Sequence, residues 1–191
     1  MKRPLNQQKT FDIFHYYLKN GFDHTTDEIV AAMGISRKTF FNRYEGKAQS
    51  VEIARQFWHT CIQDRIREKS LECNHPVEEL LLFIWEMRNI RKTEETFFQY
   101  ALQHKLFTSD DSPFMSILST LIQKGIRQYH FQEDINIPLY STFFLHNVCV
   151  EEDLGLNQDQ VIRYLLLPLL TERGMELLND VDMAYLFSLP Q

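Results

Sequence analysis

A short cationic segment, residues 36–43, carries the side chains best suited to binding a charged partner. It reads Ser-Arg-Lys-Thr-Phe-Phe-Asn-Arg, so cations, an amide and hydroxyls recur within one short stretch. Arginine pairs in bidentate fashion with guanine and asparagine with adenine, and all these polar groups can also bind phosphate. On one face of a helix they would form a reading surface for the major groove. The spacing alone equally fits an ordinary helical hairpin with a solvated polar face.

Two helices joined by a glycine turn are expected to position this segment. Thr25 and Glu28 have the spacing of a capping box, which predicts a helix start. Gly34 would end that helix and Ser36 would cap the next one. Helix, glycine-containing turn and helix is the pattern of a helix-turn-helix. The residues expected to pack the two helices together are Ile29, Met33, Ile35 and Phe40.

The rest of the chain shows helical periodicity and no sustained strand-like alternation. A first helix is expected over 6–20, with Phe11, Phe14 and Leu18 on its buried side, and a long one over 47–72. Pro168 should kink its helix, and Gly174 should separate the last two. The further helices are expected at 77–89, 92–106, 113–130, 138–153, 158–173 and 175–187. The sequence thus predicts an all-α protein, with a three-helix domain over 1–47 and a larger helical domain over 48–191.

Charge and composition narrow the functional classes. The net charge is −6, yet residues 1–47 hold eight lysines and arginines against five aspartates and glutamates, a net +3, which leaves −9 for residues 48–191. The chain has three cysteines and no CxxC pair, secretion signal or membrane-length apolar run, so we expect a cytoplasmic protein. Phosphate-binding glycine loops, GxSxG and HExxH are absent from the sequence, which argues against an enzyme and predicts no cofactor or metal.

The N-terminal quarter of the chain resembles the DNA-binding domain of TetR-type repressors. The resemblance covers about 40 residues at the N-terminal end of the chain and is more specific than a generic helix-turn-helix. It rests on Phe22, Thr25, Thr26, Ile29, Ala31, Ala32, Gly34, Ile35, Ser36, Lys38, Thr39, Phe40, Phe41, Tyr44 and Lys47. It implies a homodimeric, DNA-binding regulator of transcription, most simply a repressor released from a palindromic operator by a small apolar or aromatic ligand. The alternatives are a helical protein-interaction module and an effector-independent DNA-binding protein.

The resemblance also implies which residues contact DNA. Arg37, Lys38 and Thr39 would face bases or nearby phosphates, and Lys47 would hold a phosphate at the start of the long helix. Phe41 stands where the family often has a tyrosine that bonds a phosphate; phenylalanine lacks that hydroxyl. The expected DNA-binding set is Thr26, Ser36, Arg37, Lys38, Thr39, Phe41, Asn42, Arg43 and Lys47.

An effector pocket and a dimer interface are further implications of the resemblance. The residues expected to line a pocket are Trp58, Phe83, Phe98, Tyr129, Phe144 and His146. The interface is expected on the helices 138–153 and 158–173, through Phe143, Val148, Val161, Leu165 and Leu169. Both sets are apolar or aromatic stripes, and such stripes are also the ordinary content of a helical core.

Overall fold

A computed structural model describes residues 7–109, 112–150, 162 and 164–183 of the chain. Its helices form two compact units. Unit 1 contains residues 7–62 and 94–100, and unit 2 contains the described residues of 63–93 and 101–183. Helix α4 (Lys47–Ser70) belongs to unit 1 up to Ile62 and to unit 2 from Gln63 onward. No helix in these ranges is both long and apolar enough to cross a membrane.

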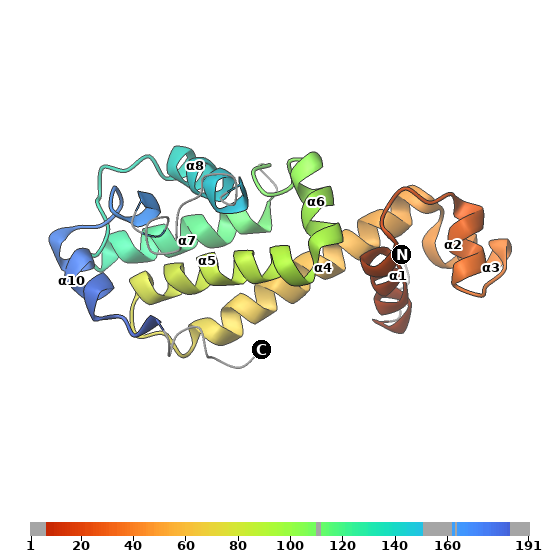
Figure 1. The fold of residues 1–191 in the computed structure, drawn as a ribbon, viewed down its shortest axis with the longest axis horizontal. Helices are drawn as coiled ribbons and strands as arrows, with labels where there is room; N and C mark the ends of the chain where they lie inside the picture. The colour runs from red at the N-terminus through yellow and green to blue at the C-terminus, as the bar shows by residue number, and fades with distance from the viewer. Residues whose placement is uncertain (1–6, 110–111, 151–161, 163, 184–191) are drawn as a thin grey trace. The chain divides into compact units, whose positions relative to one another are not determined.

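Unit 1 is built from α1 (Gln7–Asn20), α2 (Thr26–Ala32), α3 (Arg37–Tyr44) and the start of α4 (Figure 1). The first helix ends where predicted, with Gly21 at a φ of +82° that favours glycine. Its buried face differs from the prediction, because Ile13, Tyr16 and Tyr17 point inward while Phe11 is 49% exposed. The helix has aromatic residues on more than one side, and the packing against α4 selects which side is buried.

The predicted domain boundary at residue 47 falls inside unit 1. The first part of α4 packs against α1, where Phe57 lies 5.1 Å from Phe14 between ring centroids. Tyr17 of α1 also hydrogen-bonds Ser50 of α4, with 2.7 Å between their hydroxyl oxygens. The three N-terminal helices therefore share a core with α4, and the compact unit extends to Ile62.

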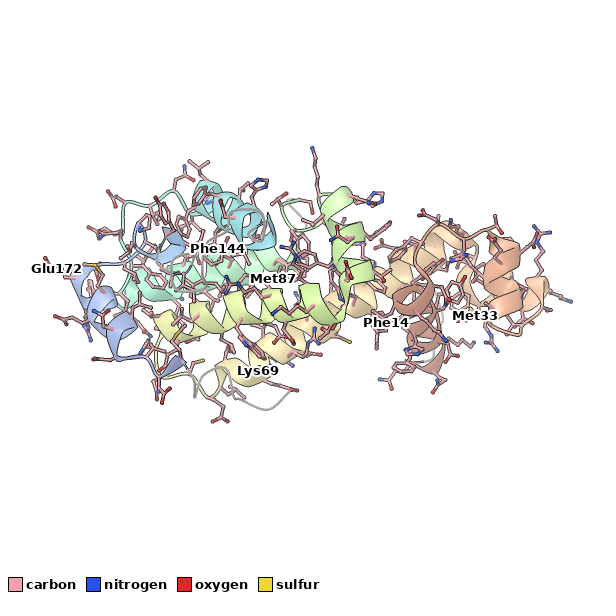
Figure 2. The ribbon with its side chains drawn as sticks, viewed as in Figure 1. Phe14, Met33, Lys69, Met87, Phe144 and Glu172 are labelled. Atoms are coloured by element: carbon pink, nitrogen blue, oxygen red, sulfur yellow. The ribbon has the colours of Figure 1, made fainter. Side chains whose placement is uncertain are left out.

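Unit 2 centres on α5 (Pro76–Thr93), which is buried on most of its surface. A helix with most of its residues buried belongs in the middle of a helical protein. Helices α7 (Pro113–Arg127) and α8 (Ile137–Val150) pack against α5 and each other, and α10 (Glu172–Asp180) also contacts α5 (Figure 1). Met87 of α5 and Phe144 of α8 lie inside this group of helices (Figure 2).

Three predicted helix boundaries are wrong. Helix α5 continues through the expected break after residue 89, and α6 (Glu95–Gln103) begins only after Glu94. Pro168 lies in a turn that ends the preceding helical segment instead of kinking a continuing helix. Gly174 lies inside α10, which begins after the capping residue Thr171. These differences arise because a proline or glycine marks a local irregularity without specifying its form.

Candidate nucleic-acid interface

Helix α2 begins with the capping box that the sequence predicts. The Thr25 hydroxyl accepts a bond from the Glu28 backbone N–H at 3.3 Å, and the Glu28 carboxylate accepts one from the Thr25 N–H at 2.7 Å. The bonds that this carboxylate accepts from the Thr25 N–H and from the Thr25 hydroxyl hold the pKa of Glu28 below its usual value. The helix stops before Gly34, whose φ of +64° is in the left-handed region. This sharp start and stop fixes where α3 begins.

Helix α3 is short and held at both ends. The Ser36 hydroxyl accepts a bond from the Thr39 backbone N–H at 3.1 Å, and the two side-chain hydroxyl oxygens lie 2.8 Å apart. At the far end, Glu45 adopts a left-handed φ of 58° and donates its N–H to the Phe41 carbonyl. Phe40 and Tyr44 are fully buried on the inner side. The helix is therefore a rigid rod with one face on the core of unit 1 and the other in solvent.

The outer face of α3 presents the residues predicted to contact DNA. Arg37, Lys38, Phe41 and Asn42 are all exposed. Thr39 and Arg43 are half-buried at its edges. The Ser36 and Thr39 hydroxyls already bond each other, so their first role is to cap the helix. Phe41 is 46% exposed although it is a large apolar ring. Such a face can offer cations to phosphates, an amide to a base and an aromatic ring to a thymine methyl.

The remaining predicted contacts frame this face. Thr26 is the first residue of α2 and Lys47 is the first residue of α4, and both are half-buried. The Arg37 guanidinium Nε lies 3.3 Å from Oδ1 of Asp27, which ties the start of α3 to the start of α2. Asp27 was absent from the predicted site, because an acidic residue ten positions before an arginine gives no local signal of a contact.

Tyr17 and Tyr44 anchor the helix-turn-helix to its neighbours, and the sequence did not identify their hydroxyl contacts. The Tyr17 hydroxyl oxygen is 2.7 Å from Oγ of Ser50, whose hydroxyl in turn donates to the Lys47 carbonyl at 2.7 Å. Burial raises the pKa of Tyr17 to about 12. Tyr44 donates its hydroxyl proton to the Lys9 carbonyl at 2.9 Å. These bonds join α3 to α1 and α1 to α4, so α3 is held to the other helices of unit 1.

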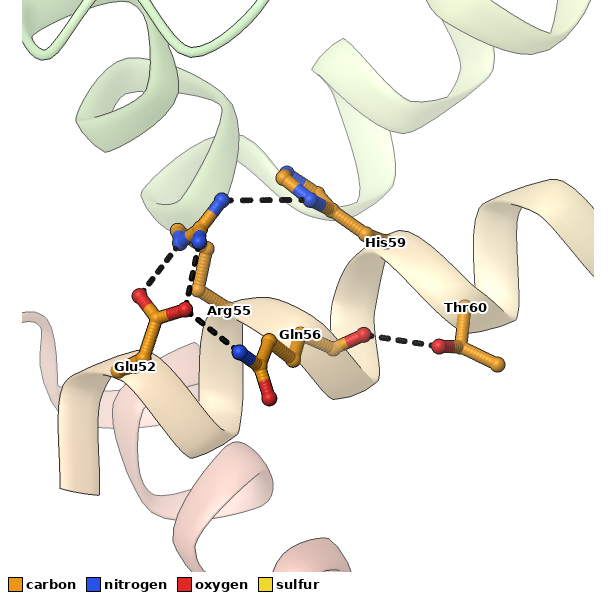
Figure 3. Close-up of polar contacts among 5 residues, drawn as sticks. All are labelled: Glu52, Arg55, Gln56, His59 and Thr60. Carbon is orange, nitrogen blue, oxygen red and sulfur yellow. Dashed lines mark hydrogen bonds and ion pairs between the residues drawn. The ribbon is translucent and has the colours of Figure 1, made fainter. Parts of the chain in front are cut away.

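A series of side-chain polar contacts follows the first part of α4 (Figure 3). Arg55 donates to both carboxylate oxygens of Glu52, at 2.8 Å from Nε and 2.6 Å from Nη2. Gln56 adds a bond to the same carboxylate, and Arg55 Nη1 lies 3.5 Å from Nδ1 of His59. Arginine can only donate, so this contact requires Nδ1 of His59 to be unprotonated. Burial, followed by the Arg55 charge, lowers the pKa of His59 to about 4.

The His59 environment predicts a loss of stability in acid. The unfolded chain binds a proton at His59 below pH 6.5, whereas the folded protein does so only near its pKa of about 4. Stability is therefore fully present above pH 6.5 and falls between these values. Between pH 7 and 4.5 the free energy of unfolding of unit 1 should drop by about 2.5 kcal/mol more than in His59→Gln. Urea unfolding in a Trp85→Phe background, followed by Trp58 emission, measures this difference.

His15 supplies the control for this pH dependence. It is an exposed histidine of the same unit, so His15→Gln should keep the wild-type loss between pH 7 and 4.5. Other groups, including carboxylates, titrate in this range in all three proteins, and the comparison cancels them. Equal acid sensitivity of His59→Gln and the wild type would contradict the assignment to His59.

Comparison with known proteins finds its matches among solved structures. The sequence matches no protein-family profile and no curated protein. A crystal structure of a gamma-butyrolactone receptor (ArpA-like protein) is 12% identical, with a TM-score of 0.62 over 91% of this chain and 93% of its own. The TetR family protein CprB from S. coelicolor A3(2) is 13% identical, with a TM-score of 0.62 over 96% and 98%. The ketosteroid transcriptional regulator KstR2 of Mycobacterium tuberculosis is 13% identical, with a TM-score of 0.58 over 87% and 95%.

The chain has a TetR-like fold. The likeness extends over nearly the whole chain, whereas the resemblance of the sequence was confined to its N-terminal part. The all-α fold class predicted from helical periodicity is therefore confirmed. At this level of identity the similarity concerns the path of the backbone, and the individual contacts of the site come from this chain's own residues.

Most of the residues predicted to line a pocket are core residues of the TetR-like fold. Trp58, Phe83, Phe98 and Phe144 are each at most 1% exposed. Phe83 and Phe144 belong to unit 2, with ring centroids 6.3 Å apart, whereas Trp58 belongs to unit 1. Tyr129 is 75% exposed in a turn, and His146 is exposed on α8. Phe83 and Phe144 therefore lie near each other within unit 2, and the pocket as a whole stays a prediction.

The residues predicted for the dimer interface also divide into two groups. Phe143 is 49% exposed on α8, next to Leu139 at 69%. Val148, Leu165 and Leu169 are at most 3% exposed and belong to the core of unit 2. Val161 lies outside the described residues. Sequence reasoning missed the exposed Leu139, Tyr164 and Leu167, because an apolar stripe does not show which of its members face inward.

Proposed function

We propose that this protein is a DNA-binding regulator of transcription that reads the major groove with α3, and is not an enzyme. The observation that carries the proposal is the capped α3, with Phe40 and Tyr44 in the core and the side chains of Arg37, Lys38 and Asn42 exposed to solvent. The start of a recognition helix is the part that reaches base edges. The proteins of similar fold whose names are given above are receptors and transcriptional regulators, which supports the same conclusion.

The charge distribution supports this orientation on a nucleic acid. Residues 1–47 carry a net charge of +3 and residues 48–191 one of −9. A polyanion attracts the positive part of the chain and repels the negative part. Collisions in which the N-terminal part faces the DNA are therefore favoured. Lys38 and Lys47 would neutralise phosphates, while Arg37 and Asn42 would contact base edges.

The test is selection of bound duplexes from a random pool by the full-length protein, followed by affinity measurements over a salt series. A specific sequence with a steep salt dependence supports the proposal. Lys38→Ala should weaken binding to all sequences and lower the magnitude of the salt slope by about 1 if Lys38 contacts a phosphate. Weak binding without sequence preference would instead support a helical interaction module.

Lys92→Ala is the matched control for Lys38→Ala. Lys92 is an exposed lysine at the end of α5 in unit 2, so its removal changes the net charge equally. Its replacement should leave the salt slope within about 0.3 of the wild-type value, because contacts and not net charge set that slope. Equal effects of the two substitutions would contradict a role for α3 in DNA binding.

We further propose a homodimer that uses the exposed apolar side of α8. Leu139 and Phe143 lie four residues apart and so share one face of the helix, and Tyr164 and Leu167 add exposed apolar area in the same unit. Large apolar side chains gathered on a surface are typical of an interaction site. A dimer with two reading helices predicts that the selected sequence is an inverted repeat with half-sites about one turn apart.

The regulatory cycle that we propose is repression released by a small apolar ligand. The gamma-butyrolactone receptor and the ketosteroid regulator of similar fold suggest the first ligands to test. A ligand releases DNA only if it binds the DNA-incompetent conformation more tightly, by a few kcal/mol for a useful switch. Operator affinity measured with and without gamma-butyrolactones and ketosteroids tests this step, and unchanged affinity with each compound would reject these ligand classes.

A further inference from the structure

The ion pair between Asp27 and Arg37 joins two residues on the outer side of the helix-turn-helix. The Arg37 Nε lies 3.3 Å from Oδ1 of Asp27, and the two side chains are 66% and 70% exposed. Neither side chain has another polar partner among residues 7–109, the part of the chain around them that the structure describes. An exposed pair of this kind adds little to stability, so its effect on folding is small.

The atoms used by this pair determine what Arg37 can still do. A guanidinium has five N–H donors in a planar fork, one on Nε and two on each terminal nitrogen. Because the Asp27 carboxylate lies beside Nε, the donors on Nη1 and Nη2 remain for a partner. Guanine presents two acceptors, O6 and N7, to the major groove, and a pair of parallel donors matches them. Arg37 is also the first residue of α3, the position from which base edges are reached.

We propose that Asp27 is a positioning residue that aligns Arg37 for a bidentate contact with one guanine of the DNA site. The inference rests on the proposed function and names the base that Arg37 recognises. A free arginine side chain loses rotamer entropy when it binds. Asp27 reduces that loss by holding the Arg37 guanidinium in place before DNA binds. The Asp27 carboxylate also repels phosphates, so it weakens binding to every sequence while improving selection of the correct one.

A merely structural role for Asp27 makes a different prediction. Asp27 is the second residue of α2, where a carboxylate slightly stabilises the helix N-terminus. Loss of that effect would lower the melting temperature slightly and leave base preference unchanged. The preference for guanine at one position therefore separates the two roles.

The experiment uses the full-length protein and the duplex selected by the wild type. Each G·C pair of a half-site is changed in turn to A·T, and each guanine to 7-deazaguanine, which lacks the N7 acceptor. One guanine should be preferred roughly 5- to 150-fold by the wild type, the range of a good bidentate contact. In Asp27→Asn that preference should fall at least threefold, while affinity for unrelated DNA rises about twofold to threefold.

Three further variants complete the test. Asp23→Asn is the matched control, because Asp23 is an exposed aspartate of the same unit for which the described residues offer no ion pair. It should raise affinity for unrelated DNA without changing the preference for that guanine. Arg37→Lys keeps the charge but loses the fork, so the preference should disappear. Adding Asp27→Asn to Arg37→Lys should then cause no further loss at that position.

The outcomes distinguish failure of this inference from failure of the proposed function. Selection of no sequence by the wild type overturns both. A second outcome is that the wild type selects a site while Asp27→Asn keeps the full preference for that guanine, or loses base preference equally at every position. Either result overturns the positioning role and leaves DNA binding standing. Asp27→Ala, checked by its circular dichroism spectrum for correct folding, must reproduce the Asp27→Asn result for the inference to hold.

Discussion

Glu86→Ala should lower the free energy of unfolding of unit 2 by about 3–5 kcal/mol, the usual cost of removing one partner from a buried ion pair. Glu86 is fully buried on α5, with Oε1 3.0 Å from Nε of Arg65 and Oε2 3.1 Å from Nζ of Lys69. Lys69 is itself 8% exposed and lies 4.2 Å above the Trp85 ring. Without the carboxylate, the Lys69 ammonium would remain buried and lose the one ion-pair partner that it has among the described residues.

The measurement is urea unfolding followed by Trp85 emission in a Trp58→Phe background, so that the single remaining tryptophan reports unit 2. Asp64→Ala is the control, since Asp64 pairs with Arg67 at 2.9 Å on the exposed side of the same α4 helix. Its loss should cost at most about 1 kcal/mol. Glu86→Leu combined with Lys69→Met should restore at least half of the stability, because neutral apolar side chains can replace a buried pair. Equal costs for Glu86→Ala and Asp64→Ala would contradict the prediction.

Gly125→Ala should destabilise unit 2 by about 3 kcal/mol, at the upper end for an overpacked core. Gly125 is buried in α7, and a Cβ atom there would lie 2.0 Å from a ring carbon of Phe131. The Phe131 ring cannot simply swing away, because its neighbours His130 and Gln132 are hydrogen-bonded to residues 169–171. The Gln132 N–H donates to the Leu169 carbonyl at 2.8 Å, and the Thr171 N–H donates to the His130 carbonyl at 3.0 Å. Alanine's better helix propensity recovers only about 1 kcal/mol of this loss.

The same Trp85 emission assay checks the Gly125 prediction. Gln123→Ala, an exposed change on the same helix, should remain within about 0.5 kcal/mol of the wild type. Phe131→Leu should be less damaging in the Gly125→Ala background than in the wild type, because a smaller side chain relieves the contact. Additive effects of the two substitutions would show that the ring and the new methyl group do not meet.

Local signals in the sequence predicted the helix-turn-helix well. The capping box of Thr25 and Glu28, the stop at Gly34 and the cap at Ser36 all occur as expected. Each depends on residues within a few positions of one another, so the chain carries the full information locally. The exposed position of Arg37, Lys38 and Asn42 follows from the same short segment once Phe40 and Tyr44 are buried.

Contacts between distant residues explain the predictions that were wrong or missing. The stripe of Phe11, Phe14 and Leu18 is more apolar than the buried set of Ile13, Tyr16 and Tyr17, and packing against α4, including the Tyr17–Ser50 bond, selected the second set. Pattern alone likewise did not separate the buried Val148 and Leu169 from the exposed Phe143. A hydrophobic residue type indicates that burial of its side chain is favourable, but it does not indicate which other residues the side chain will pack against.

Gly174 shows the limit of local reasoning most directly. The sequence marked it as a break, yet a Cβ atom there would lie 2.2 Å from the His130 carbonyl oxygen, so glycine is required for the close approach of α10 to a distant turn. The sequence by itself determined the helical class, the caps and the cationic face of α3, because neighbouring residues encode them. Only the tertiary structure decided the inward faces, the pairing of Glu86 with Lys69 and that of Asp27 with Arg37. Those depend on where separate helices meet, which no short segment specifies.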